Sequence, residues 1–424
     1  MASATSASAE RAPLLKRWAT DGTAYMVGGT AVAAFGNYVY QVLGGRALGP
    51  EGFAPVGSLL TLSFLAFAVV LLPIEQLVIR SVTWRGGFDR NPRQTIGTTI
   101  VLTVVLTSAV AAAGYEQFFG GDLGFVLLVA ASVAIHGLYV VGRGHLAGRR
   151  RFRSYGFATA AMPVSRLIVT AAVLLVGASA LGVGAALAIA PFVILLWWPV
   201  IRSDPPPIVD SDENPAVFLA SFVLAAAASQ VLLLSGPLAA ALLGAGAAVI
   251  SIVYVTLTIA RSPLLLGYSL LVRVLPPFTN LAKLGLDAEL NRWAARILTA
   301  GALLAVPAAL LGAWIGPDIV TLLFGEPFRP PSSFAALAAA GVCLGGAAMF
   351  LGQILVARGD TGRLAVSWIL ALTGAAAALV LTNGEIPTRV GVAFLVGELI
   401  AMIAAAALAV RIPKPESAPS EAAP

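Results

Sequence analysis

Four charged side chains fall inside stretches of the sequence that are otherwise almost entirely apolar: Arg166, Arg261, Glu75 and Glu398. A charged group at the centre of a membrane costs at least about 2.5–3.5 kcal/mol on insertion scales, so it usually has a partner or faces water. A guanidinium in a water-filled cavity can hold an anionic group through two parallel hydrogen bonds. These four residues are therefore the first candidates for a functional site.

The two arginines are the strongest candidates for binding an anion. Arg261 precedes Arg273, a residue expected near the inner surface, by twelve positions, which is roughly 18 Å of helix. Arg166 follows Arg153 by thirteen positions and is expected at a similar depth. We predict that both contact the substrate. The alternatives are a structural ion pair within the helix bundle for Arg261 and pairing with a buried acid for Arg166.

The two acids could couple transport to an ion. Glu398 is a candidate site for H⁺ or Na⁺, or else the partner of Arg166 or Arg261. Glu75 follows Pro73, which is expected to bend its helix because proline removes a backbone hydrogen bond. Glu75 could also couple an ion, or form an interfacial ion pair.

Four further residues complete the predicted substrate site. Arg80 is placed at the cytoplasmic mouth of a cavity, where it would meet an anionic headgroup, although it could equally be an ordinary anchor at the inner surface. Asn37 and Gln41 lie one helical turn apart, and Gln230 lies in a later apolar stretch. These three amides could bind sugar hydroxyl groups, or they could hold helices together through hydrogen bonds.

Other chemistry has few candidate residues in this sequence. One cysteine, Cys343, and two histidines, His136 and His145, leave little from which to build a metal centre. The sequence has no nucleophile–base pair and no phosphate-binding glycine loop after a strand. We therefore expect no catalytic residue, no metal and no cofactor, and the protein is predicted not to be an enzyme.

The elements that must position these residues are membrane-spanning helices. The 424-residue chain is 59% hydrophobic and 11% charged, whereas soluble proteins are about a quarter charged. Its apolar runs suit a hydrocarbon core of roughly 30 Å, and alternating strand patterns are absent. The predicted fold class is an all-α polytopic membrane protein with about twelve transmembrane helices. They are placed at 21–44, 53–79, 95–115, 123–142, 155–178, 182–201, 215–234, 239–274, 291–315, 332–357, 362–382 and 389–411.

The distribution of basic residues predicts the topology. With a cytoplasmic N-terminus, 21 of the 26 Lys and Arg residues fall in inner segments, and the outer loops hold only Arg46, Arg329 and Arg389. This asymmetry predicts twelve helices with both termini in the cytoplasm of a bacterial cell and a multi-pass location in its inner membrane. It also accounts for the net charge of +6 without a nucleic-acid partner.

The segment 203–214 is rich in proline and acidic residues and divides six predicted helices from six. We therefore predict a cytoplasmic segment at 1–20, a first lobe at 21–202, a linker at 203–214 and a second lobe at 215–411. The residues from 412 to 424 have the composition of a disordered cytoplasmic tail.

Three stretches resemble a known transporter family. The first, 36–62, resembles the opening of the polysaccharide-transporter, or oligosaccharide flippase, branch of the multidrug/oligosaccharidyl-lipid/polysaccharide exporter superfamily. It carries the loop residues of that branch at Arg46, Leu48, Gly49, Pro50, Glu51 and Phe53, and departs from it at Ala54, where glycine is common. The stretch 319–341 is similar through Phe324, Gly325 and Phe328, and 354–365 resembles the family's turn between helices 10 and 11.

This resemblance implies two six-helix lobes around a central cavity that opens alternately to each side of the membrane. It implies a substrate such as a polyprenyl-(pyro)phosphate-linked glycan, with membrane lipids as surroundings and glycan-assembly enzymes as further partners. In the family, helices 1, 2, 7 and 8 tend to line the cavity.

The expected function is to flip a lipid-linked oligosaccharide or polysaccharide precursor from the cytoplasmic to the outer leaflet by alternating access. An ion-coupled multidrug exporter of the same superfamily is the alternative, for which Glu75 and Glu398 would be the acids. A membrane glycosyltransferase would be expected to carry long outer loops with catalytic acids, whereas the outer loops here are short. A non-transporting scaffold for cell-envelope synthesis would tolerate loss of the buried arginines.

Overall fold

A computed structural model describes residues 23–85, 90–202 and 215–410, and its regular secondary structure within these ranges is entirely helical. Ten segments of the described chain are long and apolar enough to cross a membrane. The first of them, Ala24–Thr83, has 60 residues, roughly 90 Å of helix, which is enough for two crossings. The prediction of an all-α polytopic membrane protein is confirmed.

The described chain forms two compact units. Unit 1 comprises Met1–Ala226 and Gly246–Ser251, and unit 2 comprises Ala227–Ala245 and Ile252–Pro424, in each case within the described ranges. The predicted linker 203–214 and the terminal segments 1–20 and 412–424 lie outside the described residues. The predicted lobe boundaries therefore stay a prediction.

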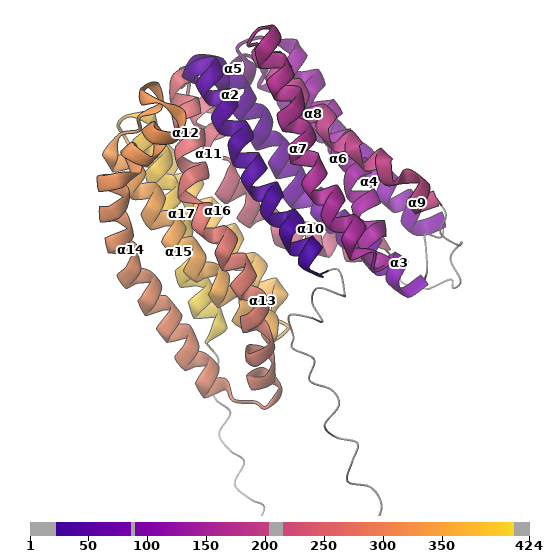
Figure 1. Ribbon diagram of the computed structural model, residues 1–424. Helices are drawn as coiled ribbons and strands as arrows, with labels where there is room; N and C mark the ends of the chain where they lie inside the picture. Colours follow the sequence, from indigo (N-terminus) through magenta and orange to yellow (C-terminus); the bar gives the residue numbers. More distant parts are fainter. Residues whose placement is uncertain (1–22, 86–89, 203–214, 411–424) are drawn as a thin grey trace, which may run out of the picture. The chain divides into compact units, whose positions relative to one another are not determined.

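Between Thr23 and Arg202, the described residues form eight α-helices, a π-helix and a 3₁₀-helix (Figure 1). They are α2 (Thr23–Ala66), η1 (Phe67–Leu71), α3 (Leu72–Arg85), α4 (Arg90–Ala113), α5 (Tyr115–Phe119), α6 (Leu123–Gly148), α7 (Phe152–Val176), α8 (Ala180–Ile189), η2 (Ala190–Trp197) and α9 (Trp198–Arg202).

The loop predicted between the first two helices is wrong. We predicted a loop between 21–44 and 53–79, whereas α2 is interrupted only at Gly49, whose φ of 69° and ψ of 174° are not helical. Glycine tolerates this positive φ, and Pro50 can begin the next helical segment because its missing N–H is not needed there. The two predicted spans are thus joined by a one-residue kink.

The second span contains the predicted irregularity at Pro73. The turn before α3 is the π-helix η1, and Pro73 lies at the second position of α3. A proline inside a helix leaves a carbonyl one turn earlier without its donor, which is a common cause of a local change in helical register.

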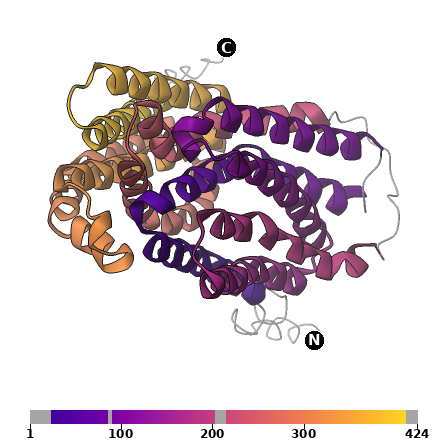
Figure 2. The same ribbon diagram turned by 90° about the horizontal axis from the view of Figure 1, so that it is seen from above.

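Glycines bring α2 and α7 into close contact, and Figures 1 and 2 show the two helices side by side. A Cβ at Gly29 would collide with the backbone of Gly156, and a Cβ at Gly36 would lie 2.8 Å from Pro163. Small residues of this kind let membrane helices pack through their backbones.

From Pro215 to Val410, the range described in the second half of the chain, there are eight α-helices and a 3₁₀-helix. They are α10 (Pro215–Leu234), α11 (Gly236–Leu242), α12 (Ala247–Ala260), α13 (Ser262–Lys283), α14 (Asp287–Phe324), η3 (Glu326–Phe328), α15 (Ser332–Ala357), α16 (Thr361–Leu381) and α17 (Ile386–Ala409).

The single long helix predicted at 239–274 is wrong. The helix is interrupted at Gly244, whose φ is 81°, and again at Arg261, which precedes Pro263 in the first turn of α13. The helix predicted at 291–315 is also too short, because α14 continues to Phe324 and ends at Gly325.

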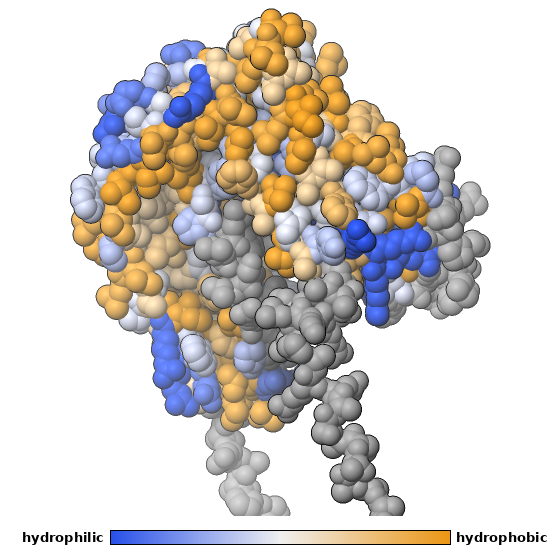
Figure 3. All heavy atoms as spheres, viewed as in Figure 1, coloured by the Kyte–Doolittle hydropathy of each residue, from blue (hydrophilic) through white to orange (hydrophobic). Residues whose placement is uncertain are grey.

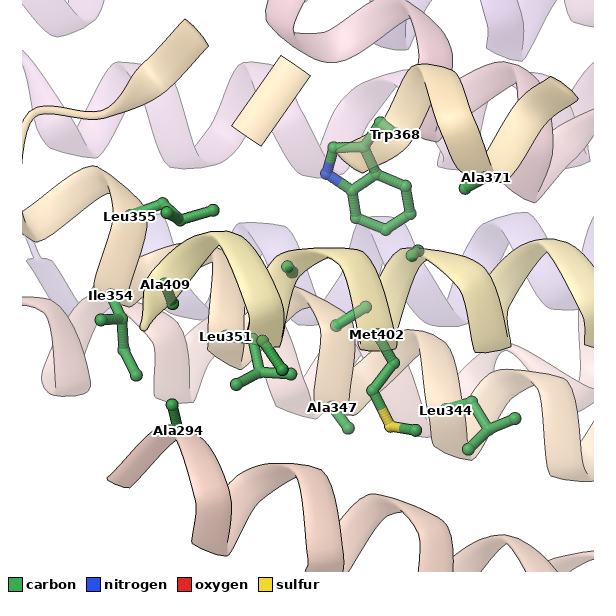
Figure 4. Packing of buried hydrophobic residues seen from close by; sticks show 14 of the residues in the cluster. Ala294, Leu344, Ala347, Leu351, Ile354, Leu355, Trp368, Ala371, Met402 and Ala409 are labelled. Carbon is green, nitrogen blue, oxygen red and sulfur yellow. The ribbon is translucent and has the colours of Figure 1, made fainter. Parts of the chain in front are cut away.

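The core of unit 2 lies between α14, α15, α16 and α17 (Figure 4). Leu351 and Ile354 of α15 and Met402 of α17 are almost completely buried, and Trp368 of α16 packs against the same cluster. Alanines at intervening positions, such as Ala347 and Ala371, keep the helices close.

Large apolar side chains on the surface mark the faces suited to lipid. On α14, the exposed side chains include Leu303, Leu310 and Trp314, each more than 60% exposed. Figure 3 shows hydrophobic residues over much of the visible surface, with hydrophilic residues gathered in separate patches. A surface of this kind is suited to contact with hydrocarbon rather than water.

Candidate functional site

Arg166 lies inside unit 1, on α7, and its side chain is 1% exposed. Its Nη1 donates a hydrogen bond of 2.6 Å to Oδ1 of Asn37 on α2, and its guanidinium carbon lies 5.2 Å from the centre of the Tyr40 ring. Tyr40 in turn donates to the carbonyl oxygen of Val183 on α8, at 2.8 Å. The cluster therefore joins three helices around one buried cation.

The predicted substrate residues Arg166 and Asn37 are thus neighbours in space. Gln41, predicted with them, is buried and donates to the backbone oxygen of Asn37 at 3.2 Å. This hydrogen bond stays within α2, while the one from Arg166 crosses between helices. In the described conformation Asn37 is thus a polar partner of Arg166.

A second polar cluster of unit 1 contains Glu75, on α3. Arg143 of α6 approaches both carboxylate oxygens, with Nη2 to Oε1 at 2.8 Å and Nη2 to Oε2 at 2.9 Å. The hydroxyl group of Tyr155 donates to Glu75 Oε1 at 3.2 Å, and the Arg143 guanidinium lies over the rings of Tyr139 and Tyr155. Glu75 is 1% exposed, so this is a buried ion pair with its own hydrogen-bond shell.

Sequence reasoning missed the role of Arg143. We predicted it to be an inner-surface residue just beyond a helix ending at 142, whereas α6 continues to Gly148 and carries Arg143 inside the bundle. Glu75 and Arg143 are 68 positions apart, and a single sequence holds no signal that pairs them. Arg80, on the same helix as Glu75, is half-buried.

In unit 2, Arg261 lies at the junction between α12 and α13 rather than in the middle of a helix. It is half-buried and lines a cavity of about 140 Å³ together with residues of α10, α11, α12, α16 and α17. Its guanidinium carbon lies 5.6 Å from the centre of the Phe394 ring of α17. The cavity is otherwise lined mainly by apolar side chains and by Ser235.

Glu398 lies one helical turn after Phe394 on α17 and is 1% exposed. Its carboxyl group is within electrostatic range of Arg261. Among the residues that the structure describes, none forms a hydrogen bond with its Oε2 atom. Gly345 of α15 makes room for this group, since a Cβ there would lie 2.6 Å from Oε2.

The remaining predicted residue, Gln230, is half-buried in α10, the helix that contributes Leu232 to the Arg261 cavity. Within each unit, the structure therefore brings together Arg166 with Asn37 and Gln41, and Arg261 with Phe394, one helical turn before Glu398. Among the described residues, no group of three or more His, Cys, Asp or Glu side chains is arranged to hold a metal ion.

Comparisons with solved structures identify the fold. An inward-facing multidrug resistance MATE family transporter of the MOP superfamily has a TM-score of 0.68 at 12% identity, covering 91% of this chain and 97% of that one. An outward-facing transporter of that kind has a TM-score of 0.54 at 14% identity, with 91% and 94% covered.

A third similar structure is a MOP superfamily transporter from Pyrococcus furiosus. The reverse polarity of its binding pocket is said to suggest a different function for that protein. Its TM-score is 0.61 at 13% identity, with 92% of this chain and 94% of that chain covered. No protein-family model and no curated protein matches the chain. The chain has the fold of these MATE-type transporters.

Proposed function

We propose, starting from this shared fold, that the chain is an alternating-access transporter that flips a lipid-linked oligosaccharide or polysaccharide precursor to the outer leaflet. Transporters of this fold are solved in inward-facing and outward-facing conformations, which supports alternating access as the mechanism. The proposal places the chain in a bacterial inner membrane with both termini in the cytoplasm, in keeping with its basic inner segments.

Arg261 beside the cavity of unit 2 is the observation that carries the choice of substrate. Its guanidinium lines a cavity whose other walls are mainly apolar, so it could donate hydrogen bonds to an anionic group that enters the cavity. A guanidinium matches the geometry of a phosphate oxygen pair, and Phe394 holds it from one side. For the similar Pyrococcus furiosus transporter, the reversed polarity of the binding pocket is said to suggest a different function. The charge of the residues that line a pocket is therefore a reasonable basis for proposing a substrate within this fold.

The other polar residues are assigned by position in this proposal. Arg166 would exchange its hydrogen bond with Asn37 for one with a phosphate or an acidic sugar when α2 moves relative to α7. Asn37, Gln41 and Gln230 would contact glycan hydroxyl groups, and Arg80 would meet the charged headgroup at the cytoplasmic side. The polyprenyl chain would stay in the hydrocarbon, and glycan-assembly enzymes would supply the substrate.

One observation favours a second candidate, an ion-coupled multidrug exporter. Glu398 is a buried carboxyl group whose Oε2 accepts no hydrogen bond from the described residues, so it could take up H⁺ or Na⁺. The same group could also supply ion coupling to a flippase. Glu75 is less suited to this role because Arg143 and Tyr155 already occupy its carboxylate oxygens.

The two candidates can be separated with purified protein in vesicles. The vesicles contain a fluorescent polyprenyl-pyrophosphate-linked sugar or a cationic dye, and movement to the opposite leaflet or lumen is measured. Wild type should flip the lipid-linked sugar. The flipping rate of Arg261→Ala should be at least ten-fold lower, and that of Arg261→Lys should lie between the two.

Arg329→Ala is a matched control, since Arg329 is 47% exposed and pairs with Asp318 at the surface, where ion pairs contribute little. Its rate should equal that of wild type. Transport of the dye but not of the lipid-linked sugar would reject the flippase and favour the exporter.

A further inference from the structure

A long apolar groove runs along one side of unit 2. It has a volume of about 670 Å³ and is lined by residues of α12, α13, α14 and α15 that are apolar or small, with Thr256 and Cys343 as the most polar. Two of its lining residues on α14, Leu304 and Leu311, are more than half exposed. The groove is therefore open to its surroundings along α14 rather than closed inside the unit.

The groove follows α14 over about the thickness of the membrane. Its residues on this helix recur every three or four positions from Ile297 to Val320, which is roughly 35 Å, against roughly 30 Å for the hydrocarbon core. Alanines and glycines such as Ala300, Gly312 and Gly346 provide the space.

The end of the groove near the start of α14 has a different chemistry. Trp293 lies one turn before Ile297 on the same face, and its ring lies 6.0 Å from that of Phe278 on α13. The guanidinium carbon of Arg296 lies 5.4 Å from the centre of the Trp293 ring. Arg296 is exposed and precedes the first groove residue of α14, Ile297, so a positive charge stacked on an indole lies close to this end of the groove.

We propose that this groove binds one hydrocarbon chain of a resident anionic phospholipid, with its phosphate group at Arg296. Tryptophan and arginine are favoured at the level of lipid headgroups, and basic residues there attract anionic lipids. A docked protein helix is a poor fit, because a helix about 10 Å wide and 35 Å long occupies roughly 2,700 Å³, about four times the volume of the groove. The site does not depend on the transported substrate.

The proposal is tested with purified protein in phosphatidylcholine vesicles that contain a phosphatidylglycerol probe with a photoreactive acyl chain. The crosslinks should map to the groove residues of α12, α14 and α15. Arg296→Gln should reduce labelling about five-fold, the factor expected for one basic residue near an anionic lipid. Ala308→Phe, which fills the middle of the groove, should remove most of the labelling of α14.

Two variants serve as matched controls. Arg93→Gln removes an exposed arginine of unit 1, and Ala302→Phe adds the same ring to an exposed position of α14 that does not line the groove. Both should label as wild type does. Equal loss in Arg93→Gln and Arg296→Gln, equal labelling by a phosphatidylcholine probe, or crosslinks spread evenly over the exposed helices would each overturn the proposal.

Discussion

Glu75 is almost fully buried inside unit 1 and meets the partly buried Arg143 with the geometry of a structural pair. Two hydrogen bonds from one Arg143 nitrogen, together with the Tyr155 hydroxyl group, satisfy the carboxylate. Removing one member of a buried pair leaves an uncompensated charge, which is more damaging than removing both. Arg261 differs, because it borders a cavity that a ligand could enter.

We predict that Glu75→Gln lowers the stability of the protein by about 3 kcal/mol, because the Arg143 charge then lacks its counter-ion in a buried site. The double variant Glu75→Leu with Arg143→Met should recover most of this loss. The measurement is the apparent Tm of the detergent-solubilised protein, determined from the fraction that still elutes as a folded protein in size-exclusion chromatography after heating. A stable Glu75→Gln protein that transports without its coupling ion would instead assign Glu75 to ion coupling.

At the scale of elements, the contact between α2 and α7 depends on glycine. The backbones of the two helices approach so closely at Gly29 and Gly156 that neither position has space for a Cβ atom. The hydrogen bond from Arg166 to Asn37 joins the same two helices. Any movement of α2 along α7 must therefore break this hydrogen bond and separate the glycine contact.

Gly156→Ala should push α2 away from α7 and destabilise the protein by about 1–3 kcal/mol, the usual cost of overpacking. Gly97→Ala on α4 is the matched control, because a Cβ there meets no atom within 4 Å. Thermal unfolding in detergent compares the two variants. Equal Tm values for both would contradict the close packing of α2 on α7.

The backbone turns between helices explain why the sequence indicated the fold better than the substrate. The three stretches that resemble the flippase branch each contain a glycine with positive φ: Gly49 at 69°, Gly325 at 102° and Gly359 at 75°. Phe324 and Phe328, in the second stretch, are buried against each other. These residues set backbone turns and packing, so they indicate the fold and contain little information about the substrate.

Hydrophobic runs predicted most of the helices, but not the interruptions within them. The one-residue kink at Gly49 was predicted as a loop, and the junction at Arg261 was predicted as continuous helix. Both depend on local backbone angles that hydropathy does not report. The pairing of Arg166 with Asn37 and of Glu75 with Arg143 joins residues that are far apart in the chain, which a single sequence without covarying positions cannot predict.

At the scale of the whole molecule, the fold and the positions of the buried charges are the two observations behind the proposed transport function. The fold is shared with transporters solved in two conformations, and each unit carries a buried or cavity-lining arginine. The central claim is that these cations serve an anionic lipid-linked substrate. If the lipid-linked substrate is made on the cytoplasmic side, its movement is from the cytoplasmic to the outer leaflet.

The most direct test of this claim is the sidedness of polyprenyl-linked sugars in cells depleted of the protein. The account predicts that intermediates accumulate on the cytoplasmic face, and that wild type restores their transfer while a stably expressed Arg261→Ala variant does not. Unchanged pools of lipid-linked sugars on both faces after depletion would contradict the account.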